Sequence, residues 1–263
     1  MKKIMAVIAA VAVALTLVGC ANFGAGKTSG TKWSKTFKLD ATGTIKDAEG
    51  NDATYSRGFA ALSTSKKCSA IETVISLAKT DAKGNTLNIT KNDADKKSVV
   101  GLAFDTHLTK DSSGKEFYDF VLVGARPSDG RWYVEHYTGV PKDDLKESMN
   151  STKETMGGTY TALASEGTDG YAGTLTGYNK EDEYTWTVKV TQDVAGTYKI
   201  FINDNQVATW KRALTEDEGK AKDPKAYGQV FVYGNAPKDT KINAKFTSNK
   251  KTTVGLFADE DEE

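Results

Sequence analysis

The alternation of hydrophobic and polar side chains is most regular in residues 184–210, where it follows a period of two. The apolar positions of the first two runs are Trp186, Val188, Val190, Tyr198, Ile200 and Ile202. A period of two is typical of strands that bury one face. Asn203-Asp204-Asn205 follows the second run, and these residue types adopt the left-handed conformations of a tight turn. The segment therefore predicts three strands joined by turns, with those six side chains facing inward.

Comparable runs recur along the chain. Further strands are predicted over residues 33–39, 71–77, 99–104, 117–124, 131–138, 227–234 and 243–247. The run 117–124 is apolar apart from Asp119, as expected of a central strand buried on both faces. Turn clusters rich in Gly, Asn and Asp separate the runs. About a dozen short strands with such spacing predict an all-β sandwich or barrel.

One segment departs from this pattern. Its apolar or small side chains are spaced four, three and four residues apart, at Leu145, Met149, Thr152 and Met156. Pro141 precedes the segment and two glycines follow it, which are start and stop signals of a helix. We expect one short helix near 142–156, laid against the sandwich.

The N-terminus has the features of an export signal. Lys2 and Lys3 precede an apolar stretch, residues 4–18, that is too short to span a bilayer comfortably. The end of this stretch, Leu17-Val18-Gly19-Cys20, resembles the lipobox of bacterial lipoproteins. The resemblance implies that residues 1–19 are a signal peptide and that Cys20 is acylated and begins the mature chain. Because Ala21 and not Asp follows Cys20, it also favours the outer membrane or cell surface over the inner membrane.

Residues on either side of the predicted strands are polar and simple in composition. Residues 20–32 are rich in Gly, Ser and Thr, which predicts a flexible tether between the lipid and the sandwich. Residues 249–263 end in five consecutive acids and are expected to form an acidic tail. We therefore expect a single sandwich domain over residues 33–248.

Charge and cysteine content limit the partners. Removing Lys2 and Lys3 with the signal from the 35 basic residues leaves 33 against 35 acidic ones. A chain with this balance offers no basic field for nucleic acid. Cys20 and Cys68 are the two cysteines, so acylation of Cys20 leaves Cys68 without an intrachain disulfide partner. We expect Cys68 to be partly buried, although an intermolecular disulfide is the alternative.

The strand sequences of the C-terminal half resemble those of the concanavalin A-like lectin/glucanase superfamily, which includes laminin-G-like domains. The similar stretches are Trp186-Thr-Val-Lys-Val, Thr197-Tyr-Lys-Ile-Phe-Ile-Asn-Asp-Asn and Tyr227-Gly-Gln-Val-Phe-Val-Tyr-Gly, with Phe246 in a last strand. The resemblance implies a jelly roll of two antiparallel sheets, one of them concave. It also makes a structural calcium ion near Asp105 or Asp111 possible, although no site can be placed. No other cofactor is expected.

Catalytic motifs are missing from the sequence. The glucanase branch of the superfamily uses acids at positions i, i+2 and i+5 of a strand, and the nearest match, Glu181-Asp182-Glu183, has Trp186 at the last position. His107 and His136 are the two histidines, and neither accompanies a Gly-x-Ser-x-Gly or His-Glu-x-x-His motif. A catalytic residue and a metal site are therefore not predicted.

The remaining candidate site is aromatic. If the six side chains named first fill the core, the opposite faces of the strands display rings together with one amide and one guanidinium. These candidate ligand-binding residues are Arg131, Tyr133, Tyr137, Phe201, Gln229, Phe231 and Tyr233. Such a surface suits a sugar, whose apolar face stacks on rings while polar groups bond its hydroxyls. In the alternative arrangement, the rings only cover the sheet or pack beneath the helix through Met149 and Met156.

Three functions follow from these observations. The first is an anchored, non-enzymatic protein that binds carbohydrate or another host or envelope ligand. The second is a glycoside hydrolase of the same fold, whose carboxylates converge only in three dimensions. The third is a structural envelope lipoprotein. Exposure of the candidate rings to solvent would favour the first over the third, because a large patch of exposed rings marks a binding site.

Overall fold

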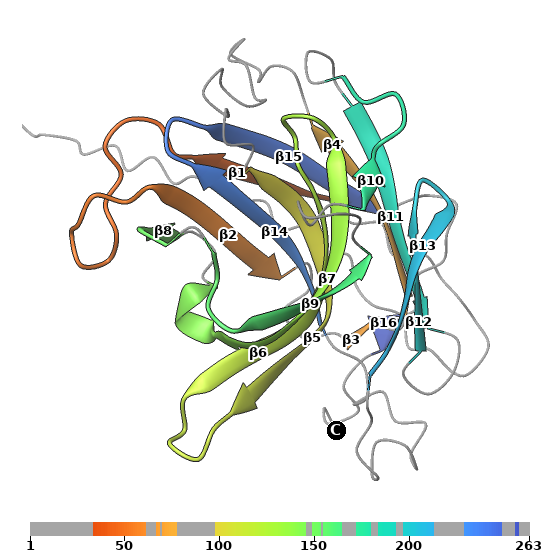
Figure 1. Cartoon of the computed structure of the whole chain (residues 1–263), viewed down its shortest axis with the longest axis horizontal. Coiled ribbons are helices and arrows are strands. Elements are labelled where there is room, and N and C mark those ends of the chain that lie inside the picture. The colour runs from red at the N-terminus through yellow and green to blue at the C-terminus, as the bar shows by residue number, and fades with distance from the viewer. Residues whose placement is uncertain are drawn as a thin grey trace, which may run out of the picture.

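Two antiparallel sheets, packed face to face, make up the structure (Figure 1). The computed structural model describes residues 34–61, 67–68, 70–77, 98–145, 149–153, 155–164, 172–179, 184–192, 197–212, 229–248 and 256–257. The predicted signal peptide, Cys20 and the tether lie outside these residues. Within them, no helix has both the length and the apolar character needed to cross a membrane.

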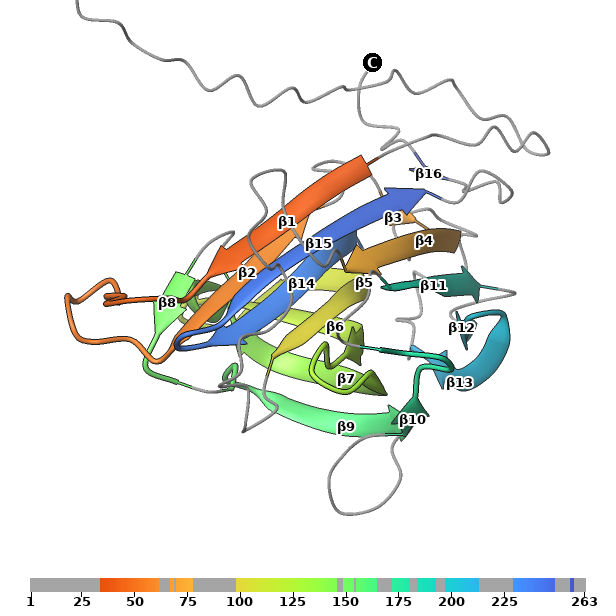
Figure 2. The same cartoon turned by 90° about the horizontal axis from the view of Figure 1, so that it is seen from above.

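The smaller sheet has six strands and contains the segment with the most regular alternation. Its strands, in spatial order, are β1 (Ser34–Asp40), β15 (Lys241–Ser248), β4 (Ala70–Leu77), β11 (Tyr184–Gln192), β12 (Thr197–Ile202) and β13 (Asn205–Lys211). Only β11 to β13 are consecutive in sequence, so the other half of the sheet is built by long-range pairing. Figure 2 shows β1 and β15 lying across β2 and β14 of the larger sheet.

The larger sheet is curved, and its concave face points away from the smaller sheet (Figure 1). We call this concave face the hollow. Its spatial order is β10 (Gly173–Thr174), β7 (Arg131–Pro141), β6 (Glu116–Ala125), β5 (Val99–Lys110), β14 (Gln229–Pro237), β2 (Tyr55–Ala61) and β8 (Met149–Ser151). A further strand, β9 (Thr159–Ala164), pairs with β7 beside β10. A separate pair joins β3 (Lys67–Cys68) to β16 (Leu256–Phe257), so part of the predicted acidic tail is a strand.

The inward face predicted from the alternation is confirmed. The exposed fractions of Trp186, Val188, Val190, Tyr198, Ile200 and Ile202 lie between 0% and 4%. They meet the inward residues of β5 and β6, among them Leu102 and Val121, in one hydrophobic core between the sheets. Burial of apolar area at about 25 cal/mol per Å² makes this layer the main source of stability. The predicted all-β, two-sheet sandwich is therefore correct.

The turn between β12 and β13 is also as predicted. Asn203 and Asp204 have φ values of 48° and 63°, which is the left-handed pair that a tight hairpin requires. The side-chain oxygen of Asn203 accepts the N–H of Thr187 at 2.9 Å, so the turn is also bonded to β11.

The predicted helix near 142–156 is wrong. Lys142–Asp144 forms one turn of 3-10 helix, and Met149–Ser151 forms β8, which pairs with the edge of β2. Pairing satisfies backbone groups of β2, and this long-range contact outweighs the helical spacing. Leu145 and Met156 are nevertheless buried against the larger sheet, as expected for the helix, because the carboxylate of Asp144 accepts the N–H of Gly157 at 2.9 Å and closes the loop.

The core assignment predicts a large difference between neighbouring strand positions. Ile200 is fully buried, so Ile200→Ala should lower the free energy of unfolding by about 3 kcal/mol. Thr185 lies exposed in β11, and Thr185→Ala should change it by no more than about 0.5 kcal/mol. Urea denaturation followed by tryptophan fluorescence measures both, and equal effects would contradict the assigned faces.

Candidate functional site

Four of the seven candidate residues lie together in the hollow of the larger sheet. Tyr133 and Tyr137 come from β7, and Phe231 and Tyr233 from β14. They belong to a second hydrophobic cluster, on the face of the sheet opposite the main core, with the further members Phe59, Val99, Ala103, Tyr118, Phe120, Leu122, Val140, Leu145 and Met156. Phe59 stacks on Phe231 with ring centroids 4.3 Å apart. The sequence thus identified four of the rings that share this face and missed Phe59, Tyr118 and Phe120.

These rings do not form an open platform. Tyr133 and Phe231 are each 7% exposed, and Tyr233 is 4% exposed. Leu145 and Met156 pack in the same cluster. The arrangement is the alternative considered from the sequence, in which rings pack beneath the segment after β7. The centre of the hollow is therefore filled by protein side chains, and the buried rings Tyr133, Phe231 and Tyr233 do not by themselves favour a binding protein over a structural one.

Phe201 does not belong to this surface. It lies on β12 of the smaller sheet, where the ammonium of Lys189 lies 5.4 Å from its ring centroid. The prediction that Phe201 shares one face with Tyr133 is wrong, because strand alternation fixes a side of a sheet but not which sheet a strand joins. Gln229 begins β14 opposite Thr106, and its side chain is outside the described part of the structure.

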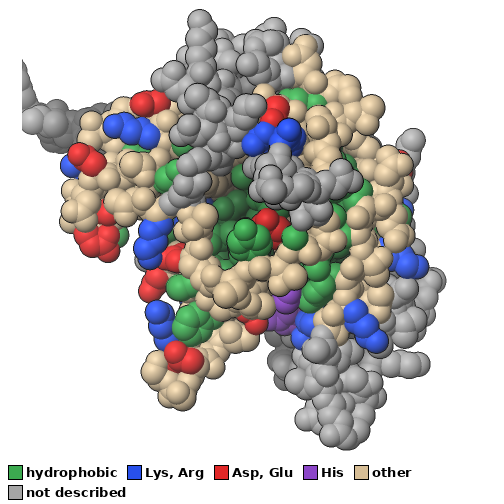
Figure 3. All heavy atoms as spheres, in the orientation of Figure 1, with side chains coloured by type: hydrophobic (Ala, Val, Ile, Leu, Met, Phe, Trp, Pro, Cys, Tyr) green, Lys and Arg blue, Asp and Glu red, His purple; other side chains and the backbone are tan. Residues whose placement is uncertain are grey.

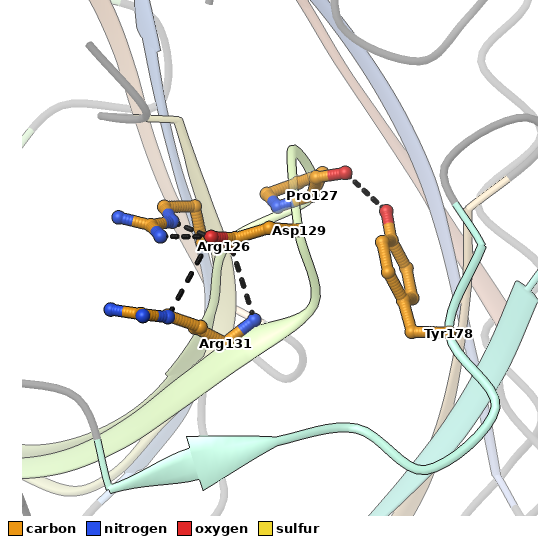
Figure 4. Close-up of polar contacts among 5 residues, drawn as sticks. All are labelled: Arg126, Pro127, Asp129, Arg131 and Tyr178. Carbon is orange, nitrogen blue, oxygen red and sulfur yellow. Dashed lines mark hydrogen bonds and ion pairs between the residues drawn. The ribbon is translucent and has the colours of Figure 1, made fainter. Parts of the chain in front are cut away.

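Arg131 stands at the start of β7, beside the turn that joins β6 to β7 (Figure 4). The carboxylate of Asp129 forms an ion pair with Arg126, accepts the backbone N–H of Arg131 at 3.3 Å, and lies 3.8 Å from the Arg131 guanidinium. The hydroxyl of Tyr178 donates to the carbonyl of Pro127 in the same turn. The side chain of Arg131 remains 41% exposed, so it can contact a ligand while the turn holds its backbone.

Polar groups lie among the rings of the hollow. The hydroxyl of Tyr137 donates to the carboxylate of Glu135 at 2.6 Å, and Arg57, which is 1% exposed, interacts with the hydroxyl of Tyr233. Burial raises the pKa of Glu135, and the hydrogen bond from Tyr137 opposes that rise. Burial likewise raises the pKa values of Tyr137 and Tyr233, which keeps both as hydroxyl donors. The hollow therefore presents an acid next to neutral phenols.

The rings reach solvent at one rim of the hollow. Phe120 stacks on Tyr137 at 5.2 Å, and Tyr137 contacts Tyr160 of β9 at 5.7 Å. Tyr160 is 63% exposed, so this series of rings leads from the buried cluster to the surface. Figure 3 shows the hollow near β14, with hydrophobic side chains gathered around an acidic one. Tyr160 was not predicted from sequence, although its alternation with Thr159 and Thr161 gave a signal.

A second polar network lies between the sheets. Asp105, which is 2% exposed, accepts the hydroxyl of Tyr198 at 2.8 Å and lies 2.9 Å from Nε2 of His107 and 3.5 Å from Nε of Arg212. The ring of Trp210 contacts both Tyr198 and His136. Burial lowers the pKa of His136, and the nearby Asp119 and Asp105 oppose that shift.

The sequence did not predict this network, because His107 and His136 were weighed only as catalytic or metal-binding residues. The sequence signal is the charged Asp105 directly after the apolar run 99–104. In the structure Asp105 has a φ of 50°, and the pairing of β5 with β6 shifts between Phe104 and His107. No group of three His, Cys, Asp or Glu side chains in the described segments could hold a metal ion. Asp105 is engaged in this network, and Asp111 accepts two N–H groups and a hydroxyl in its own turn.

No protein-family model matches this chain, and no curated protein matches it in sequence. Among solved structures, the carbohydrate-binding module CBM66 from Bacillus subtilis is similar at 13% identity and a TM-score of 0.36, over 79% of this chain and 91% of that one. β-Agarase A from Zobellia galactanivorans is similar at 7% identity and a TM-score of 0.34, over 76% and 73%. A β-porphyranase from Bacteroides plebeius is similar at 10% identity and a TM-score of 0.30, over 89% of this chain and 84% of that one. Similarities at this level assign neither a function nor a site.

The environment of Glu135 predicts a pH dependence of stability. A carboxyl group whose pKa is raised in the folded state holds its proton more tightly there than in the unfolded chain. The contribution of Glu135 to the free energy of unfolding is therefore complete at pH values below its ordinary pKa of 4.5. It is lost as the pH rises through the raised pKa of the folded state. Glu135→Gln, which stays neutral, should gain stability relative to the wild type between pH 4 and pH 7.

Chemical denaturation at a series of pH values measures this difference. Tyr137→Phe should enlarge the wild-type trend, because it removes the hydrogen bond that lowers the Glu135 pKa. If the free energies of unfolding of Glu135→Gln and wild type differed by the same amount at every pH, the raised pKa of Glu135 would be contradicted.

Proposed function

We propose that this chain is an exported, lipid-anchored protein that binds carbohydrate without altering it, at the rim of the hollow in its larger sheet. The observation that carries the proposal is the exposed ring of Tyr160 in contact with Tyr137, whose hydroxyl is bonded to Glu135. A sugar ring stacked on Tyr160 would bring its hydroxyls towards a carboxylate acceptor and phenol donors. The geometry thus combines an apolar surface and directional polar groups within a few ångströms, as small-molecule sites do.

Arg131 lies on the same face of β7 as Tyr137 but six residues away, about 20 Å along the strand, where β7 pairs with β10. Its side chain is partly exposed, so we propose that it contacts the far end of a ligand extended along β7. The buried rings Tyr133, Phe231 and Tyr233 have a different role in the proposal, since they support the rim from beneath rather than contact the ligand. The proposed contact residues are therefore Arg131, Glu135, Tyr137 and Tyr160.

The binding role is preferred over hydrolysis because, among the residues that the structure describes, the rim supplies one carboxylate, that of Glu135. Glycoside hydrolysis requires two carboxyl groups at a fixed separation across the scissile bond. Glu135 is the acid among the polar groups of the hollow described above, and its hydrogen-bond partner is a phenol. Release of reducing ends from any bound glycan would overturn the non-enzymatic part of the proposal.

Loss of the exposed ring should weaken binding at the rim without harming the fold. On a glycan and matrix-protein array probed with residues 21–263, we expect Tyr160→Ala to weaken binding at least ~10-fold, equivalent to about 1.4 kcal/mol. Phe201→Ala is the matched control, since it removes a ring from the other sheet. Undiminished binding of every glycan by Tyr160→Ala, or equal loss in both variants, would contradict the rim as the binding site.

The lipid anchor is the second part of the proposal. The order of Lys2, Lys3, the apolar stretch 4–18 and Cys20 supports it. Each buried methylene of an acyl chain contributes about 0.8 kcal/mol, so several chains give a stable attachment to the outer membrane or cell surface. Anchoring would place the binding rim at a surface where extracellular or envelope glycans are available.

Substitution of the modified residue tests the anchor directly. Cys20→Ser should abolish incorporation of labelled palmitate and shift the protein out of the membrane fraction, whereas Cys68→Ser should retain both the label and the location. Labelling that persists in Cys20→Ser would contradict the proposal.

A further inference from the structure

A groove lies on the face of the larger sheet opposite the hollow. It has a volume of about 530 Å³ and is open to solvent. Three segments line it: the end of the β5–β6 hairpin, the β7 residues Thr138 and Gly139, and Gly158 with Thr159 at the start of β9. Its volume falls within the range of about 300–1,000 Å³ that small-molecule sites occupy.

The groove is formed by an irregularity in the pairing of β6 with β7. The register shifts between Tyr118 and Phe120, and the intervening Asp119 accepts the N–H of Gly139 at 2.7 Å. Gly139 has a φ of 64°, and Gly158 lies so close that a Cβ there would stand 2.5 Å from the carbonyl oxygen of Thr138. Asp119, the one polar residue in the apolar run 117–124, therefore fixes the floor of the groove.

The groove and the rim lie on opposite faces of β7 and β9. Tyr137 pairs with Tyr160, and the next residues, Thr138 and Thr159, pair with one another. Because successive strand residues point to opposite faces, the tyrosines border the hollow while the threonines line the groove. The hydroxyls of Thr138 and Thr159 lie 2.8 Å apart. A ligand in the groove would therefore not share side chains with one at the rim.

The lining of the groove suits a neutral ligand rich in hydroxyls. Phe117 provides a half-buried ring, Asp119 a carboxylate acceptor, and Thr138 and Thr159 hydroxyls that both donate and accept. Three ammonium groups and three carboxylates balance one another around it, from Lys110, Lys115, Lys142, Asp111, Glu116 and Asp119. This balance gives no preference for polyanions or polycations.

We infer that the groove is a second carbohydrate site, specific for neutral oligosaccharide. The inference rests on the proposed carbohydrate-binding function but uses a separate set of residues. Two sites on opposite faces of one edge strand would let the protein hold two chains, or two stretches of one chain. Linking two weak sites in this way raises the overall affinity for a polymer above that of either site.

The test compares three variants on one array of neutral and acidic oligosaccharides. Thr159→Arg places a long side chain in the groove from an exposed position, and Asp119→Asn removes the charge while keeping an oxygen that can accept the Gly139 N–H. Thr185→Arg, on the smaller sheet, is the matched control for an added arginine. Both groove variants should lose at least ~10-fold in affinity for a subset of neutral glycans that Tyr160→Ala still binds.

Each outcome decides between the two sites. A calorimetric stoichiometry of two for the best neutral oligosaccharide, reduced to one by Thr159→Arg and by Tyr160→Ala separately, would support both. A stoichiometry of one that only Tyr160→Ala abolishes would overturn the groove and leave the rim. Binding that only the groove variants abolish would retain the groove and overturn the rim. An array on which the wild type binds no glycan, or an equal effect of Thr185→Arg, would overturn the groove inference.

Discussion

The burial of both faces of the larger sheet is the constraint on which the rest of the structure depends. Because side chains alternate along a strand, neighbouring residues of β6 enter different layers: Val121 packs between the two sheets, and Leu122 packs in the hollow. The inner layer fixes the smaller sheet in place, and the outer layer fills the centre of the hollow. A ligand can therefore reach this sheet only at its margins, where Tyr160 and the groove lie.

The network around Asp105 determines where one of these margins begins. A buried carboxylate is stable only when polar groups surround it, and Tyr198 and Arg212 reach Asp105 from the smaller sheet. Beyond this point β5 changes from buried to exposed, and its hairpin with β6 extends past the inter-sheet core. The far end of this hairpin lines the groove, where the separate shift in the pairing of β6 with β7 places Asp119.

The alternation of side chains predicted which residues of a strand face inward. It did not predict which strands pair over long distances in the chain, and the candidate site depends on that pairing. The inward positions of β11 and β12 follow from alternation alone, and the turn at Asn203 follows from residue type. Phe201 was misplaced because alternation does not distinguish two sheets whose order depends on the pairing of β4 with β11, over 100 residues apart. The helix near 142–156 was wrong for a related reason, since an unpaired edge of β2 is not visible in the spacing of Leu145 and Met156. Four of the five candidate rings were correctly grouped, but their burial depends on which loop covers them.

Edge strand β9 contributes to both of the proposed binding surfaces of a sheet whose faces are otherwise filled. Within the described residues it pairs with β7 alone, and its first four residues are exposed. Since Thr159 and Tyr160 are adjacent but face opposite sides, a single short strand supplies a hydroxyl to the groove and a ring to the rim. The backbone hydrogen bonds to β7 hold both side chains in a fixed relation, so neither surface needs a flexible loop to form. Preorganisation of this kind reduces the entropy lost on binding. Shallow sites at the margin of a well-packed sheet would therefore suffice for the weak, repeated contacts with a polymer that we propose.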